Sequence, residues 1–302
     1  MPSAAGSIPD QRVKLSGSTR VAGVIGDPIR HSLSPVLHNA AFRALQLDWV
    51  FLAFHVAEGE APTAVTGARA LGIEGLSVTM PHKAAVLGAL DRLSPTAERL
   101  GAVNTITTRA GLLVGESTDG PGFLDALRQD EGFDPDGRRC LVVGAGGAAR
   151  AVVLALGQAG AAEIVVANRT ASRAEAAVAL AGPVGRVGRL DEAESVDLVV
   201  NATPLGMGDG ALPVDPGRLG AGQLVVDLVY HPAVTPLVAA ARERGATAVN
   251  GLGMLIHQAA HAFRLWTGQD PPLDAMSAAA VSALARGGGE GPLNSRPQAA
   301  ED

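Results

Sequence analysis

Short, largely apolar runs alternate along the chain with segments whose apolar residues recur at helical spacing. Runs of this kind, bounded by Gly, Pro or Asp, are typical of strands buried on both faces of a parallel sheet. They lie at residues 21–25, 49–54, 73–79, 139–143, 163–167, 196–201 and 224–228. The alternation predicts an α/β fold with parallel sheets and helical crossovers.

Local signals predict where two of the helices begin. Pro81 follows a strand and precedes apolar residues at helical spacing, which predicts a helix from Pro81 with Lys83 in its first turn. Ser172 and Glu175 match the capping-box pattern for the helix after the strand at 163–167. Residues 1–18 and 287–302 are poor in large apolar side chains, and we expect both ends of the chain to be disordered.

Length, composition and charge argue against several classes of protein. The 302 residues, 47% of them apolar, suffice for two domains of ordinary size. The net charge of −6 and the lack of a basic cluster argue against nucleic-acid binding. No apolar run has the length of a membrane span and the first residues do not resemble a signal peptide, so we expect a cytoplasmic protein. Cys140 is the only cysteine, which excludes an intrachain disulfide.

A glycine-rich turn, Gly144-Ala145-Gly146-Gly147-Ala148, follows the strand at 139–143 and opens a helix. Glycines at such a turn let the backbone approach a pyrophosphate, and the helix N-terminus supplies N–H groups and a favourable dipole. The turn alone is a weak signal, because any strand-to-helix connection can be rich in glycine. The strands before and after it favour a dinucleotide-binding site.

The end of the next strand indicates which dinucleotide binds. An NAD site commonly has an acidic residue there, which accepts hydrogen bonds from the ribose hydroxyls. Here the strand ends in Asn168-Arg169-Thr170, and Arg173 follows, so two guanidinium groups and a hydroxyl are available for a 2′-phosphate. This favours NADP, although two solvated arginines at a helix start would give the same pattern.

Lys83 and Asp119 are candidates for acid–base chemistry. Only two of the 24 basic residues are lysines, Lys14 and Lys83, and lysine can release its proton where arginine cannot. Lys83 follows the strand at 73–79, and ligands of such sheets bind outside the carboxyl ends of the strands. Asp119 can hold the amine in place. The alternatives are a surface lysine kept by chance and an aspartate that caps the helix before Pro121.

The histidine pair His257 and His261 has the spacing of a zinc-binding helix, but Gln258 occupies the position of the catalytic glutamate. We therefore predict no metal site, and we interpret both histidines as helix-packing residues.

Several segments, taken in order, resemble the shikimate dehydrogenase family. The resemblance covers about residues 20–285 and rests on the segments 26–35, 77–83, 102–105, 117–120, 144–150, 168–170, 201–203, 227–230 and 251–261. Each motif alone is weak, but their order and spacing together are specific.

The resemblance implies two domains and a reaction. Residues 19–118 would form an open, mostly parallel α/β substrate domain, with 252–286 packing back onto it. Residues 119–251 would form a Rossmann-like NADP domain. The family reduces 3-dehydroshikimate to shikimate with NADPH, reversibly, on the route to chorismate and the aromatic amino acids. The implied partner is a small-molecule substrate, and the chain would be a monomer or homodimer.

The resemblance also implies the site residues. Lys83 would be the acid–base residue and Asp119 its partner. The residues that would contact the substrate are Ser32, Ser34, Thr79, Asn104, Asp119, Tyr230 and Gln258. The residues that would contact the cofactor are Gly144, Ala145, Gly146, Gly147, Ala148, Asn168, Arg169, Thr170, Arg173, Thr203, Leu228, Gly251 and Met254.

Two departures from the family pattern leave alternatives open. Ser77 and Ser117 stand where the family often has Asn, and both flank substrate positions. Quinate or aminoshikimate would then be the substrate in place of shikimate. An NADP-binding sensor without catalysis has no need for both Lys83 and Asp119. A methylenetetrahydrofolate-type dehydrogenase fits the Ser32 loop less well than a small polyol acid does.

Overall fold

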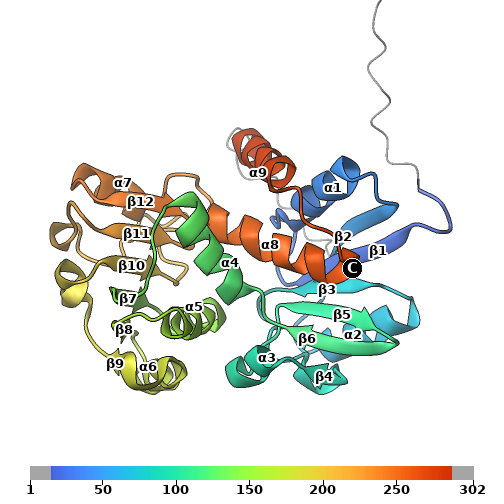
Figure 1. The fold of residues 1–302 in the computed structure, drawn as a ribbon, viewed down its shortest axis with the longest axis horizontal. Coiled ribbons are helices and arrows are strands. Elements are labelled where there is room, and N and C mark those ends of the chain that lie inside the picture. The colour runs from blue at the N-terminus through green and yellow to red at the C-terminus, as the bar shows by residue number, and fades with distance from the viewer. Residues whose placement is uncertain (1–14, 288–302) are drawn as a thin grey trace, which may run out of the picture.

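The computed structural model describes residues 15–287, which form two six-stranded sheets joined by helices that run between them (Figure 1). Within this described part of the chain, the first sheet holds strands β1–β6 and the second sheet holds strands β7–β12. Strands alternate with helices through most of the chain, as the apolar pattern predicts. The expected α/β fold class is confirmed.

The first sheet is mixed, with strand order β2-β1-β3-β5-β6-β4. Its β1 pairs in parallel with β2 and β3, whereas β5 is antiparallel to both of its neighbours. The strands are β1 (Arg20–Gly26), β2 (Trp49–His55), β3 (Gly75–Val78), β4 (Arg92–Leu93), β5 (Thr105–Arg109) and β6 (Leu112–Glu116). Because β1, β2 and β3 are parallel, their carboxyl ends lie at the same edge of the sheet.

The second sheet is parallel throughout, with strand order β12-β11-β10-β7-β8-β9. This order is that of a dinucleotide-binding sheet, with β7 and β10 on either side of the point where the order reverses. The strands are β7 (Arg139–Val143), β8 (Glu163–Ala167), β9 (Gly185–Val187), β10 (Leu198–Asn201), β11 (Leu224–Asp227) and β12 (Thr247–Asn250).

Helices cover both faces of each sheet and bury an apolar core on each side. In the first sheet, Phe42, Phe51 and Phe263 belong to the cluster under α1, α8 and α9, and a second cluster lies under α2 and α3. In the second sheet, one cluster lies under α5 and α6 and the other under α7. The helices are α1 (Ser34–Ala44), α2 (Ala61–Ala70), α3 (Pro95–Leu100), α4 (Asp119–Asp125), α5 (Gly147–Gln158), α6 (Ala171–Val178), α7 (Pro236–Glu243), α8 (Leu252–Thr267) and α9 (Leu273–Gly287).

Helices α4 and α8 lie in the middle of the molecule, between the two sheets (Figure 1). They touch where Gly122 faces Gln258: a Cβ on Gly122 would lie 2.4 Å from the Gln258 backbone nitrogen, so only glycine allows this approach. Trp266, near the end of α8, donates its indole N–H to the Ile106 carbonyl at 3.0 Å. These contacts bring the C-terminal part of the chain back onto the first sheet.

The predicted helix from Pro81 is wrong. Residues 80–86 form successive turns, followed by a short 3-10 helix at Leu87–Ala89. An α-helix would use the Lys83 carbonyl as an acceptor for its own backbone, but that carbonyl accepts the Val103 N–H at 2.8 Å. Lys83 therefore lies in a loop that tertiary contacts hold, and not in the first turn of a helix of its own.

Two smaller expectations also need correction. Helix α6 begins at Ala171, directly after Thr170, and no side chain caps it, so Ser172 does not form a capping box. Of the N-terminal segment expected to be disordered, residues 15–18 are described, and Ser18 donates to the Asp48 carboxylate at 3.1 Å. At the other end, residue 287 belongs to α9. The rest of both segments, 1–14 and 288–302, lies outside the described residues.

Among residues 15–287, no helix has the length and apolar character needed to cross a membrane.

Candidate active site

Lys83 and Asp119 form an ion pair between the two sheets. Lys83 lies in the loop after β3, and Asp119 is the first residue of α4. Lys83 Nζ lies 2.5 Å from Asp119 Oδ2, with exposed side-chain fractions of 23% and 10%. A charged pair that is largely shielded from water but still accessible can act on a ligand that enters from the open side.

Asn104 holds the carboxylate of Asp119 from the other side. Its Nδ2 donates to Asp119 Oδ1 at 2.7 Å and to Thr118 Oγ1 at 2.9 Å. Its Oδ1 accepts the Thr118 N–H at 2.8 Å and the Thr105 hydroxyl at 3.1 Å. Asn104 is buried, so every polar atom of its side chain is used inside the protein. These bonds fix the first turn of α4 and with it the direction of the Asp119 carboxylate.

The ion pair lies next to the glycine-rich turn. A Cβ on Gly147 would be 3.7 Å from Lys83 Cδ, so the Lys83 side chain runs alongside the start of α5. Lys83 follows β3 of the first sheet, whereas Gly147 follows β7 of the second. The carboxyl edges of the two sheets therefore meet at this point, where α/β proteins bind their ligands.

The backbone of the glycine-rich turn requires glycine at its first position. Gly144 has φ +110°, and a Cβ there would lie 2.9 Å from the Ala202 carbonyl oxygen. Helix α5 begins at Gly147 with Gly146 before it, and no side chain among residues 15–287 caps its N-terminus. The first N–H groups of α5 therefore remain available to an anion.

A cleft of about 1170 Å³ lies along the carboxyl edge of the second sheet. It brings together six of the predicted cofactor residues, namely Gly144, Asn168, Arg169, Thr170, Arg173 and Thr203. Its wall also carries apolar side chains from the segments after β9 and β10, including Leu190, Leu205 and Leu212. A groove lined by arginines and by apolar side chains suits a phosphorylated adenosine.

A buried polar network fixes the loops after β10 and β11. Asn201 Nδ2 and the Thr235 hydroxyl donate to the two oxygens of Asp227 at 2.8 and 2.6 Å, and Asn201 Oδ1 accepts from Thr203. Burial raises the pKa of Asp227, and its hydrogen bonds from Thr235, Val229 and Asn201 oppose that rise. The network places Thr203 at the cleft.

The remaining predicted substrate residues lie in the loops after β1, β3 and β11 and on helices α1 and α8. The Ser32 hydroxyl accepts the Ser34 N–H at 3.2 Å, and Thr79 packs against Gly26. Gln258 lies on α8 and faces Gly122, which is one turn after Asp119 on α4. The side-chain amide of Gln258 donates to the Leu255 carbonyl. Burial raises the pKa of Tyr230, which follows β11. Within residues 15–287, no hydrogen bond joins Ser32, Ser34 or Tyr230 to the Lys83–Asp119 pair.

The other predicted cofactor residues do not line the large cleft. Ala145, Gly146, Gly147 and Ala148 belong to the turn and to α5, whereas Leu228 and Gly251 follow β11 and β12. A Cβ on Gly251 would overlap the Leu228 carbonyl, so these two backbones touch. Met254 lines a smaller cavity of about 220 Å³ beside α4.

The two histidines of α8 contact carboxylates. His257 Nε2 lies 3.1 Å from Asp130, and His261 Nε2 lies 2.7 Å from Asp125. Both partners come from α4 and the π-helical turn that follows it, so the histidines bind α8 to α4 as the interpretation of helix-packing residues predicts.

Sequence reasoning missed two kinds of site residue. Thr118 was not singled out, although it precedes Asp119 and shares the bonds of Asn104. Arg189 and Arg218 line the cleft, but the strand β9 before Arg189 was not predicted because it is only three residues long. The signal for Arg189 is its position just after β9, the strand next to β8, because the ends of both strands lie at the cofactor cleft.

A parallel dinucleotide-type sheet, joined to a mixed sheet with a lysine–aspartate pair at the junction, defines a two-domain dehydrogenase. Three family models match the chain: "Shikimate dehydrogenase substrate binding domain" over residues 24–106, "Shikimate / quinate 5-dehydrogenase" over 127–204, and "Shikimate 5'-dehydrogenase C-terminal domain" over 251–281. The chain belongs to the shikimate dehydrogenase family, as the sequence motifs predict.

Similar proteins cover nearly the whole chain. Shikimate dehydrogenase (NADP(+)) of Geobacter sp. (strain M21) is 47% identical over 286 residues, which cover 91% of this chain and 99% of that protein. The enzyme of the same name from Moorella thermoacetica is 45% identical over 296 residues, or 94% and 100% of the two chains. The crystal structure of shikimate 5-dehydrogenase from Thermus thermophilus, in complex with NADP(H) and shikimate, is 40% identical with a TM-score of 0.82, and the match covers 87% of this chain and 99% of that one.

Proposed function

We propose that this chain reduces 3-dehydroshikimate to shikimate with NADPH, reversibly, on the route to chorismate and the aromatic amino acids. The observation that carries the proposal is the Lys83–Asp119 pair beside the glycine-rich turn. A bound dinucleotide and a proton-transferring side chain would meet at that point. The names of the relatives support the same reaction.

The residues of the second sheet fit NADP. Gly144 leaves room for a close approach, the start of α5 offers free N–H groups, and Arg169 and Arg173 line the cleft. NADP, when bound, supplies or accepts the hydride. The protein has to orient the ring, exclude water and transfer the proton.

Lys83 transfers the proton in the proposed mechanism. During reduction its ammonium donates a proton to the substrate oxygen as that oxygen gains negative charge, and during oxidation the neutral amine takes the hydroxyl proton back. Asp119 holds the ammonium in place at 2.5 Å, and Asn104 holds Asp119. Asp119 can also accept a hydrogen bond from a substrate hydroxyl.

The substrate contacts are proposals as well. Ser32 and Ser34, in the loop after β1 and at the start of α1, would bind the carboxylate with their hydroxyls. Thr79, Asn104 and Gln258 would face the ring hydroxyls, with Tyr230 at the edge of the site. In this assignment Asn104 acts mainly by positioning Asp119, because its own polar atoms are already bonded within the protein.

We propose the same division of labour between the two halves of the chain. Residues 19–118 hold the first sheet, and 252–286 return to it through α8 and α9. These parts would form the substrate domain, and residues 119–251 would form the NADP domain. The pairing of Lys83 with Asp119 then joins one domain to the first residue of the other.

The test measures the absorbance of reduced cofactor with purified protein. Shikimate, quinate and aminoshikimate are each offered with NADP and with NAD. We expect turnover of shikimate with NADP, and a kcat about 10²- to 10⁴-fold lower in Lys83→Ala. Lys83→Arg is the matched variant, because arginine keeps the positive charge but does not release a proton near neutral pH.

The outcomes separate the candidates. Loss of kcat in both variants, with NADP binding unchanged, supports the acid–base role of Lys83. Full activity in Lys83→Arg would overturn that role, because charge alone would then suffice. Turnover of quinate or aminoshikimate in place of shikimate would keep the mechanism and change the substrate. NADP binding without turnover of any of the three would favour a sensor.

A further inference from the structure

The cofactor cleft contains more positive charge than the two arginines after β8 provide. Arg189 and Arg218 line it as well. Arg218 is engaged elsewhere, since its Nη1 donates to the Asp191 carbonyl and to Glu194. Arg189 pairs only through Nε, with Asp191 at 3.2 Å, and its side chain is 81% exposed. Among the described residues, both Nη groups of Arg189 therefore have no hydrogen-bond partner.

The register of the sheet places Arg189 beside the proposed phosphate site. Strand β8 pairs in parallel with β9, with Val166 opposite Val187, and the Gly188 N–H donates to the Val166 carbonyl. Continuing this register by two residues puts Arg189 opposite Asn168, which directly precedes Arg169, and all three residues line the cleft. Neighbouring parallel strands lie about 4.8 Å apart, so these segments end side by side at the cleft.

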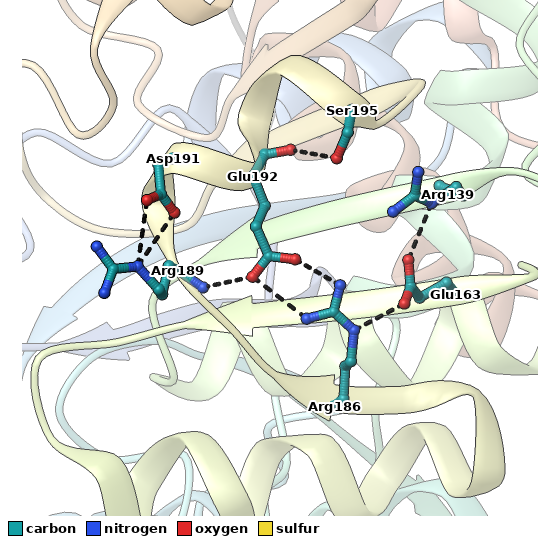
Figure 2. A network of polar contacts seen from close by, with 7 residues as sticks. All are labelled: Arg139, Glu163, Arg186, Arg189, Asp191, Glu192 and Ser195. Atoms are coloured by element: carbon teal, nitrogen blue, oxygen red, sulfur yellow. Dashed lines mark hydrogen bonds and ion pairs between the residues drawn. The ribbon is translucent and has the colours of Figure 1, made fainter.

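A network of ion pairs holds the backbone of Arg189 in that place (Figure 2). Arg186 bridges two carboxylates, with Nε on Glu163 at 2.7 Å and both Nη groups on Glu192. Glu192 in turn accepts the Arg189 N–H at 2.9 Å. Arg186 is also the main cause of the lowered pKa values of Glu163 and Glu192, so the network stays charged at neutral pH.

Gly188 allows this arrangement to be compact. A Cβ at that position would lie 2.3 Å from Val165 Cγ1 and 2.4 Å from Glu192 Oε1. The segment after β9 thus lies close against β8. Asp191 then fixes the side chain of Arg189 through Nε and leaves its outer edge free for a second anion.

We propose that Arg189 binds the 2′-phosphate of NADP together with Arg169 and Arg173, and that it raises the preference for NADP over NAD. The proposal rests on the proposed function only in that NADP is the cofactor. Asp191 and Glu192 act as positioning residues for it. A third guanidinium can form charge-assisted hydrogen bonds with a phosphate dianion. The uncharged adenine and the ribose hydroxyls of NAD offer no such negative charge.

The experiment measures binding by calorimetry and needs no turnover. NADP, NAD, 2′,5′-ADP and 5′-AMP are titrated into the unaltered protein, Arg189→Ala, Arg189→Lys and a control. The control is Arg264→Ala, because Arg264 is an exposed, ion-paired arginine outside the cleft. For Arg189→Ala we expect the Kd of NADP and 2′,5′-ADP to rise about five- to tenfold, while those of NAD and 5′-AMP change less than about twofold. Arg189→Lys should recover part of the loss, and Arg264→Ala none of these changes.

Two results would overturn the proposal. Equal weakening of NADP and NAD in Arg189→Ala would mean that Arg189 contacts the adenosine and not the phosphate. An unchanged Kd for NADP would mean that it contacts neither. Failure of the unaltered protein to turn over shikimate, with these binding differences intact, would refute the proposed reaction and leave the role of Arg189 standing.

Discussion

Replacing Asn104 by alanine should separate the orientation of Asp119 from the stability of the fold. The amide of Asn104 makes hydrogen bonds to Asp119, to the backbone and hydroxyl of Thr118, and to Thr105. Alanine removes all of them. The Asp119 carboxylate then keeps Lys83 as its remaining side-chain partner, and it can rotate.

The expected magnitude follows from these bonds. The Thr118 N–H is buried and is left without an acceptor, at about 1–3 kcal/mol, and the lost bond to Asp119 costs about 1 kcal/mol more. The hydroxyls of Thr105 and Thr118 lie 3.2 Å apart and keep a hydrogen bond to each other. We therefore expect Asn104→Ala to lower the free energy of unfolding by about 2–4 kcal/mol. Misorientation of the ion pair should lower kcat by about 10- to 100-fold, which corresponds to about 1.4–2.7 kcal/mol.

The assay pairs unfolding in urea with steady-state kinetics, and Asn39→Ala is its control. Asn39 bridges α1 and β2, with Nδ2 on the Phe51 carbonyl and Oδ1 on the Phe51 N–H, both at 2.9 Å. Its removal should also destabilise the fold by about 1–3 kcal/mol. Because Asn39 lies away from Asp119, we expect its kcat to stay within about twofold of the unaltered protein.

Two results would refute this reasoning. If Asn39→Ala and Asn104→Ala lose kcat equally, the loss reflects instability of the first sheet and not the orientation of Asp119. If Asn104→Ala is destabilised but keeps its kcat, Asp119 does not need Asn104 to hold Lys83.

Two further predictions concern packing and pH. Gly122→Ala should destabilise the fold by about 1–3 kcal/mol, because the added Cβ would lie 2.4 Å from the Gln258 backbone nitrogen. The control Gly67→Ala lies in an open position on α2 and should stabilise the fold by about 0.5–1 kcal/mol. Equal effects of the two variants in urea unfolding would contradict the close contact between α4 and α8. His38 is fully buried among Phe42, Phe51 and Trp266, and both of its ring nitrogens lack a hydrogen-bond partner within residues 15–287. This burial lowers the pKa of His38 from 6.5 to about 3. The folded chain therefore binds a proton on His38 more weakly than the unfolded chain does. The stabilisation from burying neutral His38 is complete above pH 6.5, and it falls by up to about 1.4 kcal/mol per pH unit as the pH drops toward 3. His38→Leu should remove this part of the pH dependence, and an unfolding free energy that falls equally steeply with pH in both proteins would contradict it.

Local patterns predicted those parts of the fold in which short-range and long-range forces agree. The predicted apolar runs became strands β1, β2, β3, β7, β8, β10 and β11. The same reasoning failed after Pro81, where the spacing of apolar residues is helical but Val103 takes the Lys83 carbonyl. It also failed at Ser172, because α6 begins at Ala171 and its N-cap residue is Thr170.

The sequence by itself determined the chemistry that the site can perform. It placed a rare lysine and an aspartate after strand and hairpin segments, a glycine-rich turn after β7, and arginines where an NAD site would have an acid. These assignments follow from residue type and local position, which the chain carries without folding. Only the tertiary structure decided that Lys83 and Asp119 meet, that Asn104 binds Asp119, and that Arg189 lines the same cleft as Arg169. Such contacts join segments far apart in the chain, and they depend on sheet register and helix packing, which no local pattern encodes.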